Sequence, residues 1–356
     1  MIKSKKNRKL FIALGTICMV VLIGMIPLFN YWYTAPPENT CALCHEAREH
    51  VYSFQHSAHR ELNCTECHGT AFTHGVNSLV DKAGMIWLHF FNNIEDPQMT
   101  EMQRLEIMNN CKRCHESQYA RWEAGKHAAT YADIFLDSVH NSTEQLNYDC
   151  LRCHGMFYHG TIEDLVEPIS TTGPWHFKEE GRAQMHAIPC MACHTIHTDG
   201  LPVKAEILYA DSGDSLQYAH YHRTYGVGIY DRAEKTHFTV DELPKPIIYY
   251  DENPISISDE LSTRNCIQCH APNARRESGT SDDRTPRGVH EGLSCIACHD
   301  PHSGESKNSC ITCHPAISNC NIDVTLMNTT YHDKNSPNNI HFVSCADCHE
   351  NSASSR

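Results

Sequence analysis

Cys41-Ala42-Leu43-Cys44-His45 is the first of nine copies of the pattern Cys-x-x-Cys-His in this chain of 356 residues. Two cysteines at this spacing can both add to the vinyl groups of one haem as thioethers, and the adjacent His then reaches the iron from the same side. Each copy therefore predicts one covalently bound c-type haem, and we number the copies motif one to motif nine in chain order. The predicted thioether cysteines are Cys41, Cys44, Cys64, Cys67, Cys111, Cys114, Cys150, Cys153, Cys190, Cys193, Cys266, Cys269, Cys295, Cys298, Cys310, Cys313, Cys345 and Cys348. The predicted proximal iron ligands are His45, His68, His115, His154, His194, His270, His299, His314 and His349.

Zinc and disulfide interpretations explain the pattern less well. A zinc site combines two Cys-x-x-Cys pairs or adds spaced His pairs, and neither arrangement explains a His after the second Cys in every copy. A disulfide framework is disfavoured because cysteines this close in sequence pair poorly. The motifs also use all the cysteines except Cys18 and Cys320. Nine c-type haems are thus the predicted cofactors.

The composition favours a fold built around those haems. Only 40% of the residues are hydrophobic, which is thin for two self-sufficient cores in a chain of this length. The haems would supply the missing apolar volume, with the polypeptide as a shell around them. We therefore expect a mainly α fold with extensive irregular loops, and few strands because no stretch sustains an apolar alternation of period two.

The charge balance is acidic. The formal net charge is −14, with 43 acidic residues against 29 basic ones. Five of the basic residues precede the apolar N-terminal segment, so the remainder of the chain is more acidic still. This balance disfavours nucleic acid as a partner.

The N-terminal segment has the length of a membrane span. Residues 10–29 are uncharged and mostly apolar, whereas the core of a signal peptide is usually shorter. Tyr31, Trp32 and Tyr33 follow as an interfacial aromatic belt, and the basic cluster before the span predicts a cytoplasmic N-terminus. A cleaved signal peptide is the alternative, but no small-x-small cleavage site follows. We expect a single-pass anchor in the cytoplasmic membrane with the haem-binding part on the periplasmic or extracellular side.

The motif order predicts the domain organisation. Motifs one and two are laid out like motifs three and four, which indicates a duplicated two-haem unit. The longest stretch without a motif follows motif five. The predicted parts are a basic tip and transmembrane anchor in residues 1–34, a five-haem domain in 35–199, a haem-free insert in 200–265 and a four-haem domain in 266–356.

Two stretches between motifs two and three predict helices. Apolar residues recur at helical spacing over residues 76–91, and that face could lie on the membrane or pack against haems. Asp96 and Pro97 are typical of an N-cap and a first helical residue, which predicts a helix that runs to about Met108.

Histidines outside the motifs are candidate distal ligands. The chain has 27 histidines, of which the motifs use nine, so every haem could have two imidazole ligands and none is forced to be open. Position close to a motif favours His59, His186, His197, His290, His302 and His341. Further candidates, for which a surface role is an equal alternative, are His74, His127, His140, His159, His176 and His237.

The N-terminal residues 1–92 resemble the membrane-anchored quinol dehydrogenase cytochromes of the NapC/NirT/NrfH type. The matching features are the single anchor, motif one close to the membrane face, and Ser57-Ala58-His59 ahead of motif two. The resemblance implies a quinol site near the first haem, served by acidic and lysine side chains, for which Asp81 and Lys82 are the nearest candidates. Ala47 stands where family members commonly carry Met, and their haems are fewer. The C-terminal part is similar to the class III, cytochrome c3-like multihaem cytochromes. The features that carry this similarity are Cys295–His299, the nearby His302 and the closely following Cys310–His314.

The leading functional hypothesis is a membrane-anchored electron-transfer protein of anaerobic respiration. It would take electrons from quinol, menaquinol above all, or from another membrane redox subunit, and pass them to a periplasmic or extracellular redox protein. It could act as a homo-oligomer or as a subunit of a complex. The alternative is a terminal reductase of nitrite, hydroxylamine or a sulfur oxyanion, which would need one open haem.

Overall fold

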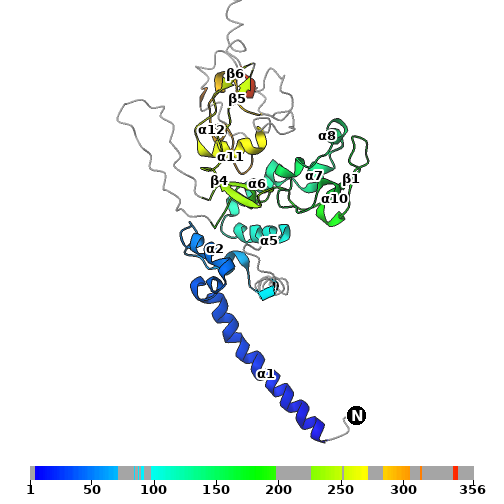
Figure 1. Ribbon diagram of the computed structural model, residues 1–356, viewed down its shortest axis with the longest axis vertical. Coiled ribbons are helices and arrows are strands. Elements are labelled where there is room, and N and C mark those ends of the chain that lie inside the picture. The colour runs from blue at the N-terminus through cyan, green and yellow to red at the C-terminus, as the bar shows by residue number, and fades with distance from the viewer. Residues whose placement is uncertain are drawn as a thin grey trace, which may run out of the picture. The chain divides into compact units, whose positions relative to one another are not determined.

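The computed structural model of the chain is mostly helical, with irregular loops and three short hairpins in the part that it describes (Figure 1). Contacts within the chain divide it into two compact units. The first comprises Met1–Gln98 and His197–Asp199, and the second Met99–Ile196 and Gly200–Arg356. The residues that the structure describes are 5–70, 84, 87, 90–91, 98–197, 226–250, 252–271, 284–304, 313–314 and 340–343.

The first unit begins with the long helix α1, Lys5–Thr34. Its segment Phe11–Thr34 is long and apolar enough to span a membrane, and none of it is buried within the protein. The helix ends just before Pro36 and Pro37, which lack the N–H that a further turn would need. The elements that follow are η1 Pro37–Asn39, η2 Cys41–Leu43, α2 His45–Gln55 and α3 Cys64–His68.

The second unit begins with α5, Glu101–Lys112, and here the predicted helix start is wrong. The N-cap is Thr100 rather than Asp96, and residues 98–99 are not helical. The Thr100 hydroxyl accepts from the Gln103 N–H, and the Gln103 side chain accepts from the Thr100 N–H, which forms a capping box. This reciprocal pair satisfies two backbone donors at the start of the helix.

The remaining elements of the second unit are short, as a shell around cofactors requires. The helices are α6 Glu116–Ala124, η3 Lys126–Ala128, α7 Tyr131–Phe135, α8 Ser138–Thr143, α9 Cys150–Cys153, α10 Ile162–Leu165, η4 Glu180–Arg182, η5 Cys190–Ala192, α11 Leu261–His270, η7 Gly288–His290, α12 Cys295–Cys298 and η9 Ile340–Phe342. The antiparallel hairpins pair β1 Val166–Glu167 with β2 His176–Phe177, β3 Gly228–Asp231 with β4 Thr236–Thr239, and β5 Ile248–Tyr250 with β6 Asn253–Ile255.

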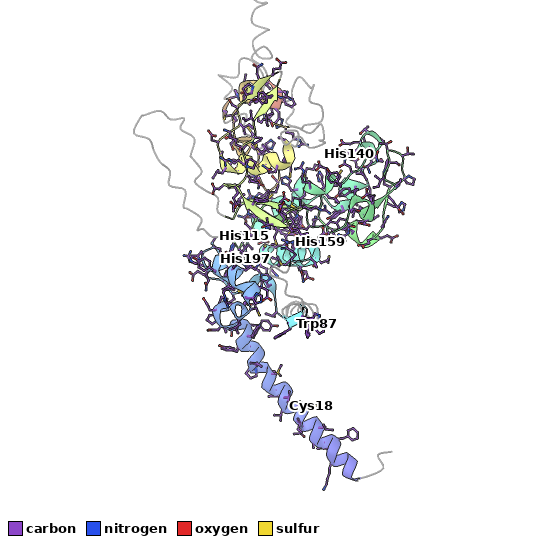
Figure 2. The ribbon with its side chains drawn as sticks, viewed as in Figure 1. Cys18, Trp87, His115, His140, His159 and His197 are labelled. Carbon is purple, nitrogen blue, oxygen red and sulfur yellow. The ribbon has the colours of Figure 1, made fainter. Side chains whose placement is uncertain are left out.

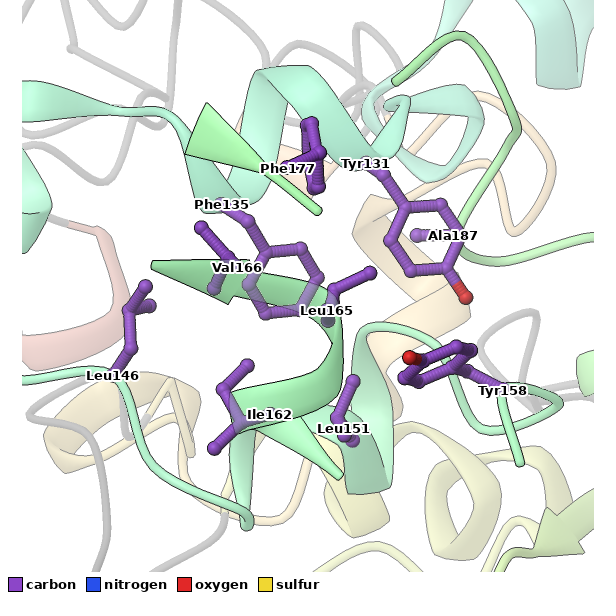
Figure 3. Packing of buried hydrophobic residues seen from close by; sticks show 10 residues of the cluster. All are labelled: Tyr131, Phe135, Leu146, Leu151, Tyr158, Ile162, Leu165, Val166, Phe177 and Ala187. Atoms are coloured by element: carbon purple, nitrogen blue, oxygen red, sulfur yellow. The ribbon is translucent and has the colours of Figure 1, made fainter. Parts of the chain in front are cut away.

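The largest apolar cluster lies in the second unit, beside motif four (Figure 3). Tyr131 and Phe135 of α7 are fully buried, and Leu151 of α9 lies in the same cluster. The other members are Leu146, Tyr158, Ile162, Leu165, Val166, Phe177 and Ala187. Because Leu151 lies between the two cysteines of motif four, this core fixes the backbone of that motif.

Of the predicted apolar face at residues 76–91, the structure describes only Trp87 and a few neighbours (Figure 2). The Trp87 and Phe91 rings are in contact at 4.2 Å between centroids, and both side chains are more than half exposed. Whether this face meets lipid or haem stays a prediction.

Candidate haem-binding sites

A helical turn explains how motifs three, four, five and seven present their side chains. In motif four the His154 N–H donates to the Cys150 carbonyl oxygen at 2.9 Å, and the same bond closes motifs three, five and seven at 2.9, 3.0 and 2.9 Å. Residues three and four apart on a helical turn share one face. Both thiols and the imidazole of a motif therefore point to the same side, as attachment to one haem requires.

Thiols of different motifs interact in three places. No disulfide joins the cysteines in the described part of the chain. The interacting pairs are Cys41 and Cys64 of motifs one and two, Cys153 and Cys269 of motifs four and six, and Cys266 and Cys295 of motifs six and seven. Burial, with a contribution from Cys111 of motif three, raises the pKa of the Cys190 thiol in motif five to about 12. The attachment points of these pairs of motifs are therefore neighbours in space.

Five motif histidines face a second histidine ring across a nearly constant separation. The ring centroids are 6.0 to 6.3 Å apart in all five pairs. The planes are nearly parallel in two pairs, at 13° and 14°, and inclined by 48°, 58° and 81° in the others. The pairs are His194–His302, His299–His341, His270–His127, His68–His197 and His314–His290.

This separation fits two imidazoles on one metal ion. A transition metal lies roughly 2 Å from an imidazole nitrogen, and each ring centre lies about 1 Å further, so two axial rings stand about 6 Å apart. Ordinary aromatic contacts also occur at this distance, as between Phe54 and His197 at 6.0 Å, so the fit rests on a motif histidine facing another histidine in all five pairs. The residues present therefore fit haem: two cysteines and a histidine on one side, and a second imidazole at the right distance on the other.

Backbone carbonyls hold several of these rings through Nδ1. A bond of this kind fixes the tautomer and the ring orientation, and it leaves Nε2 for a metal. The bonds run from His197 Nδ1 to the His50 oxygen at 2.9 Å, from His290 Nδ1 to the Ile340 oxygen at 2.9 Å and from His299 Nδ1 to the Gly304 oxygen at 3.1 Å. His186, which lies outside the five pairs, has the same kind of bond to the Ala128 oxygen at 2.6 Å.

The surroundings of these rings favour the neutral imidazole that metal ligation requires. Burial lowers the pKa of His270 to about 3, helped by the nearby charge of Arg284 and by neighbouring histidines. Burial likewise lowers the pKa of His341 to about 4, with contributions from His299 and Arg284. The same desolvation lowers the pKa of His197.

Other predicted ligands lie elsewhere. His140 and His159 are exposed (Figure 2). His176 is also exposed, and its Nε2 lies 3.0 Å from Glu167, whereas His237 Nε2 donates to the Met191 oxygen at 2.7 Å. The ring of His186 packs on Trp122 at 4.8 Å. Among the residues that the structure describes, none of these five histidine rings contacts a motif histidine.

Other predicted residues are not among the five histidine pairs. Four of them lie in described segments, namely His45, His59, His115 and His154. The predicted residues outside the described segments are His74, His349, Asp81, Lys82, Cys310, Cys345 and Cys348. The predicted quinol site therefore stays a prediction.

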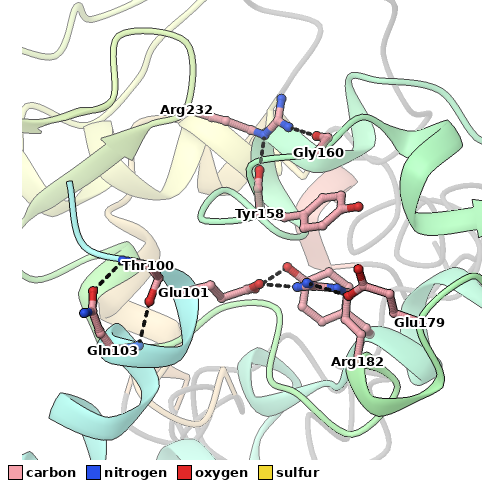
Figure 4. Close-up of polar contacts among 9 residues, drawn as sticks. Thr100, Glu101, Gln103, Tyr158, Gly160, Glu179, Arg182 and Arg232 are labelled. Atoms are coloured by element: carbon pink, nitrogen blue, oxygen red, sulfur yellow. Dashed lines mark hydrogen bonds and ion pairs between the residues drawn. The ribbon is translucent and has the colours of Figure 1, made fainter. Parts of the chain in front are cut away.

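Sequence reasoning missed a buried polar cluster beside motif four (Figure 4). Glu101 accepts from the Tyr131 hydroxyl at 2.5 Å and forms an ion pair with Arg182, which also pairs with Glu179 at 3.2 Å. Burial and the Glu101 charge raise the pKa of Tyr131. A cleft of about 400 Å³ adjoins the cluster, and Phe157 is among its lining residues.

Two family models match separate segments of the second unit. The model of cytochrome c554 and c-prime matches residues 110–195, which contain motifs three to five. The model of cytochrome c3 matches residues 250–315, which contain motifs six to eight. No curated protein and no solved structure matches the chain significantly. The motifs, the paired imidazoles and both matches support a multihaem c-type cytochrome that binds its haem covalently and transfers electrons.

Proposed function

We propose that this protein is a membrane-anchored cytochrome of anaerobic respiration that oxidises quinol, menaquinol above all. It passes the electrons to a periplasmic or extracellular redox protein. The observation that carries the proposal lies in the first unit, where the apolar helix α1 ends at Thr34 and motif one begins at Cys41. So short a connection supports a first haem close to the membrane surface, where quinol is available.

The rest of the first unit supports an electron path away from that surface. Thr40, directly before motif one, is buried, so the backbone at the start of the motif is packed against the rest of the first unit. The thiols of Cys41 and Cys64 interact, which makes the attachment points of motifs one and two neighbours. When bound, a haem iron with two imidazole ligands has no free coordination site and exchanges single electrons with a nearby redox partner. His197 supplies the second imidazole opposite His68.

The proposal is tested by mixing the oxidised protein, reconstituted in vesicles, with a menaquinol analogue and following haem reduction. We expect rapid reduction that a quinol-site inhibitor blocks. No reduction, in a protein that dithionite still reduces fully, would refute quinol oxidation and favour a relay fed by another membrane subunit. A high-spin ferric signal that responds to nitrite or sulfite would instead favour the terminal reductase.

Variants locate the quinol site. Asp81→Asn and Lys82→Gln should slow reduction by menaquinol but leave reduction by dithionite unchanged, if these side chains handle the quinol's protons. The matched control is Glu163→Gln, which removes an exposed charge from α10 in the second unit and should alter neither rate. Equal rates in all three variants and the parent chain would exclude Asp81 and Lys82 from the site.

A further inference from the structure

Two of the five histidine pairs join segments that different family models match. His127 belongs to the segment similar to cytochrome c554 and c-prime, and it faces His270 of the cytochrome c3-like segment at 6.0 Å. In return, His302 of the c3-like segment faces His194 of the other segment at 6.3 Å. The two segments therefore each present an imidazole to a motif of the other, within the second compact unit.

The two contacts meet in one dipeptide. The His127 ring lies beside the backbone carbonyl of Pro301, and His302 is the next residue. A carbonyl beside one ring nitrogen of a metal ligand can orient the ring and leave the other nitrogen for the metal. Pro301 therefore stands beside the ring that faces His270, and His302 itself faces His194, with ring planes inclined by only 13°.

Three further contacts hold this dipeptide. Arg121 of α6 pairs with Asp300 at 2.6 Å, and the Asp300 side chain is largely buried. The other oxygen of Asp300 accepts from the backbone N–H groups of His302 at 2.9 Å and of Ser303 at 3.2 Å. These three contacts fix the backbone of the turn.

Gly125 permits the close approach of the two segments. A Cβ at this position would lie 2.2 Å from the Ser303 carbonyl oxygen, and its other nearest neighbours are also backbone atoms of Ser303. Only a residue without a side chain fits so close to backbone. Because Gly125 stands two residues before His127, and Ser303 directly follows His302, the approach occurs where both rings are presented.

We propose that the two segments exchange haem ligands, with His127 as the distal ligand of the haem at motif six and His302 as that of the haem at motif five. The turn Asp300–Ser303 positions both rings through Arg121 and Pro301. This inference rests on haem attachment at these two motifs and does not depend on quinol oxidation. It implies that the haem sites of motifs five and six are each built from both segments.

The test is to replace each histidine in the full-length holoprotein and to count high-spin haems. We expect His127→Ala and His302→Ala each to convert one haem per chain from low-spin to high-spin by magnetic circular dichroism and electron paramagnetic resonance, and the double variant to convert two. Haem content should not change, because the thioether bonds remain. Added imidazole should restore the low-spin signal, which a merely structural role would not allow.

Matched controls and a second substitution keep the test decisive. His140→Ala and His176→Ala remove exposed histidines and should leave every haem low-spin. His127→Met and His302→Met should keep the iron six-coordinate and introduce the absorption band of methionine ligation, which reports the same pairing if an alanine variant fails to accumulate. An unchanged low-spin spectrum in the alanine variants, or the absence of that band in the methionine variants, would overturn the exchange.

The positioning role of Asp300 has its own readout. Asp300→Ala should release the backbone of His302 and Ser303 and give a fraction of high-spin haem with unchanged haem content. Asp259→Ala is the control, because it also removes an acid from an ion pair, with Lys245 at 2.5 Å, but from a side chain that is 92% exposed. A fully low-spin Asp300→Ala protein would remove Asp300 from the proposal.

Discussion

The buried ion pair of Glu101 and Arg182 offers a sharp test of what stabilises the second unit. The Glu101 side chain is 9% exposed and that of Arg182 16%, and the Tyr131 hydroxyl donates to the same carboxylate. Glu101→Gln keeps the shape and one hydrogen-bond acceptor but removes the charge. It leaves the buried guanidinium with one carboxylate partner, Glu179, whose side chain is 70% exposed.

The magnitude follows from that arrangement. Removing one member of a buried ion pair typically costs about 3–5 kcal/mol, because the other charge stays desolvated without compensation. Arg182 keeps Glu179 at 3.2 Å and some contact with solvent, so we expect the lower end of this range. A loss of about 3 kcal/mol in a unit of this size lowers the unfolding midpoint by roughly 6–12 °C.

The assay is thermal and guanidinium unfolding of the haem-loaded protein, with variants compared by midpoint because a cofactor-rich chain is not strictly two-state. Glu179→Gln is the matched control. It removes the exposed partner of the same arginine and should cost less than about 1 kcal/mol. Equal midpoints for Glu101→Gln and Glu179→Gln would refute the reasoning, since burial would then not decide the cost.

Three further predictions concern the core, a helix cap and the cofactor count. Phe135→Ala, at a fully buried position, should destabilise the protein by about 3–5 kcal/mol, whereas the exposed Val139→Ala should change the unfolding midpoint little. Thr130→Ala should cost about 1 kcal/mol at neutral pH. The backbone N–H and hydroxyl of Thr130 lower the pKa of Asp133 from 3.8, so the parent's advantage is present above that pH and shrinks as the pH falls through the lowered pKa, which unfolding at several pH values measures. The pyridine haemochrome assay and the intact mass should give nine covalent haems per chain, and fewer would contradict the motif count.

Local sequence determined what local chemistry could determine. Motifs three, four, five and seven each close their own helical turn, so the shared face of Cys150, Cys153 and His154 follows from spacing alone. The N-cap of α5 also depends on residues close in sequence, Thr100 and Gln103, but the pattern at Asp96 and Pro97 favoured an earlier helix start. A capping box pairs two backbone donors at once, and a lone aspartate before proline does not.

Pairing across the chain could not be read in the same way. His302 stands three residues after a motif histidine, yet the ring it faces is His194 rather than its neighbour His299. Similarly, Glu101 and Arg182 are 81 residues apart and carry no signal of their association. Spacing selects candidates, but only tertiary packing brings an imidazole to within about 6 Å of a particular partner, as two axial ligands require.

The proposed exchange of ligands also bears on how the chain is divided. Family resemblance separates residues 110–195 from 250–315, and the motif order likewise predicts a five-haem and a four-haem domain. Two sites shared between those segments would couple their stability, because removing either segment would strip a ligand from a haem of the other. The contact of Cys153 with Cys269 also links the two segments, because it makes the attachment points of motifs four and six neighbours. On this view the segments match different family models but form one electron-transfer unit, and a spin-state change after His302→Ala would appear at motif five, far from the substitution in sequence.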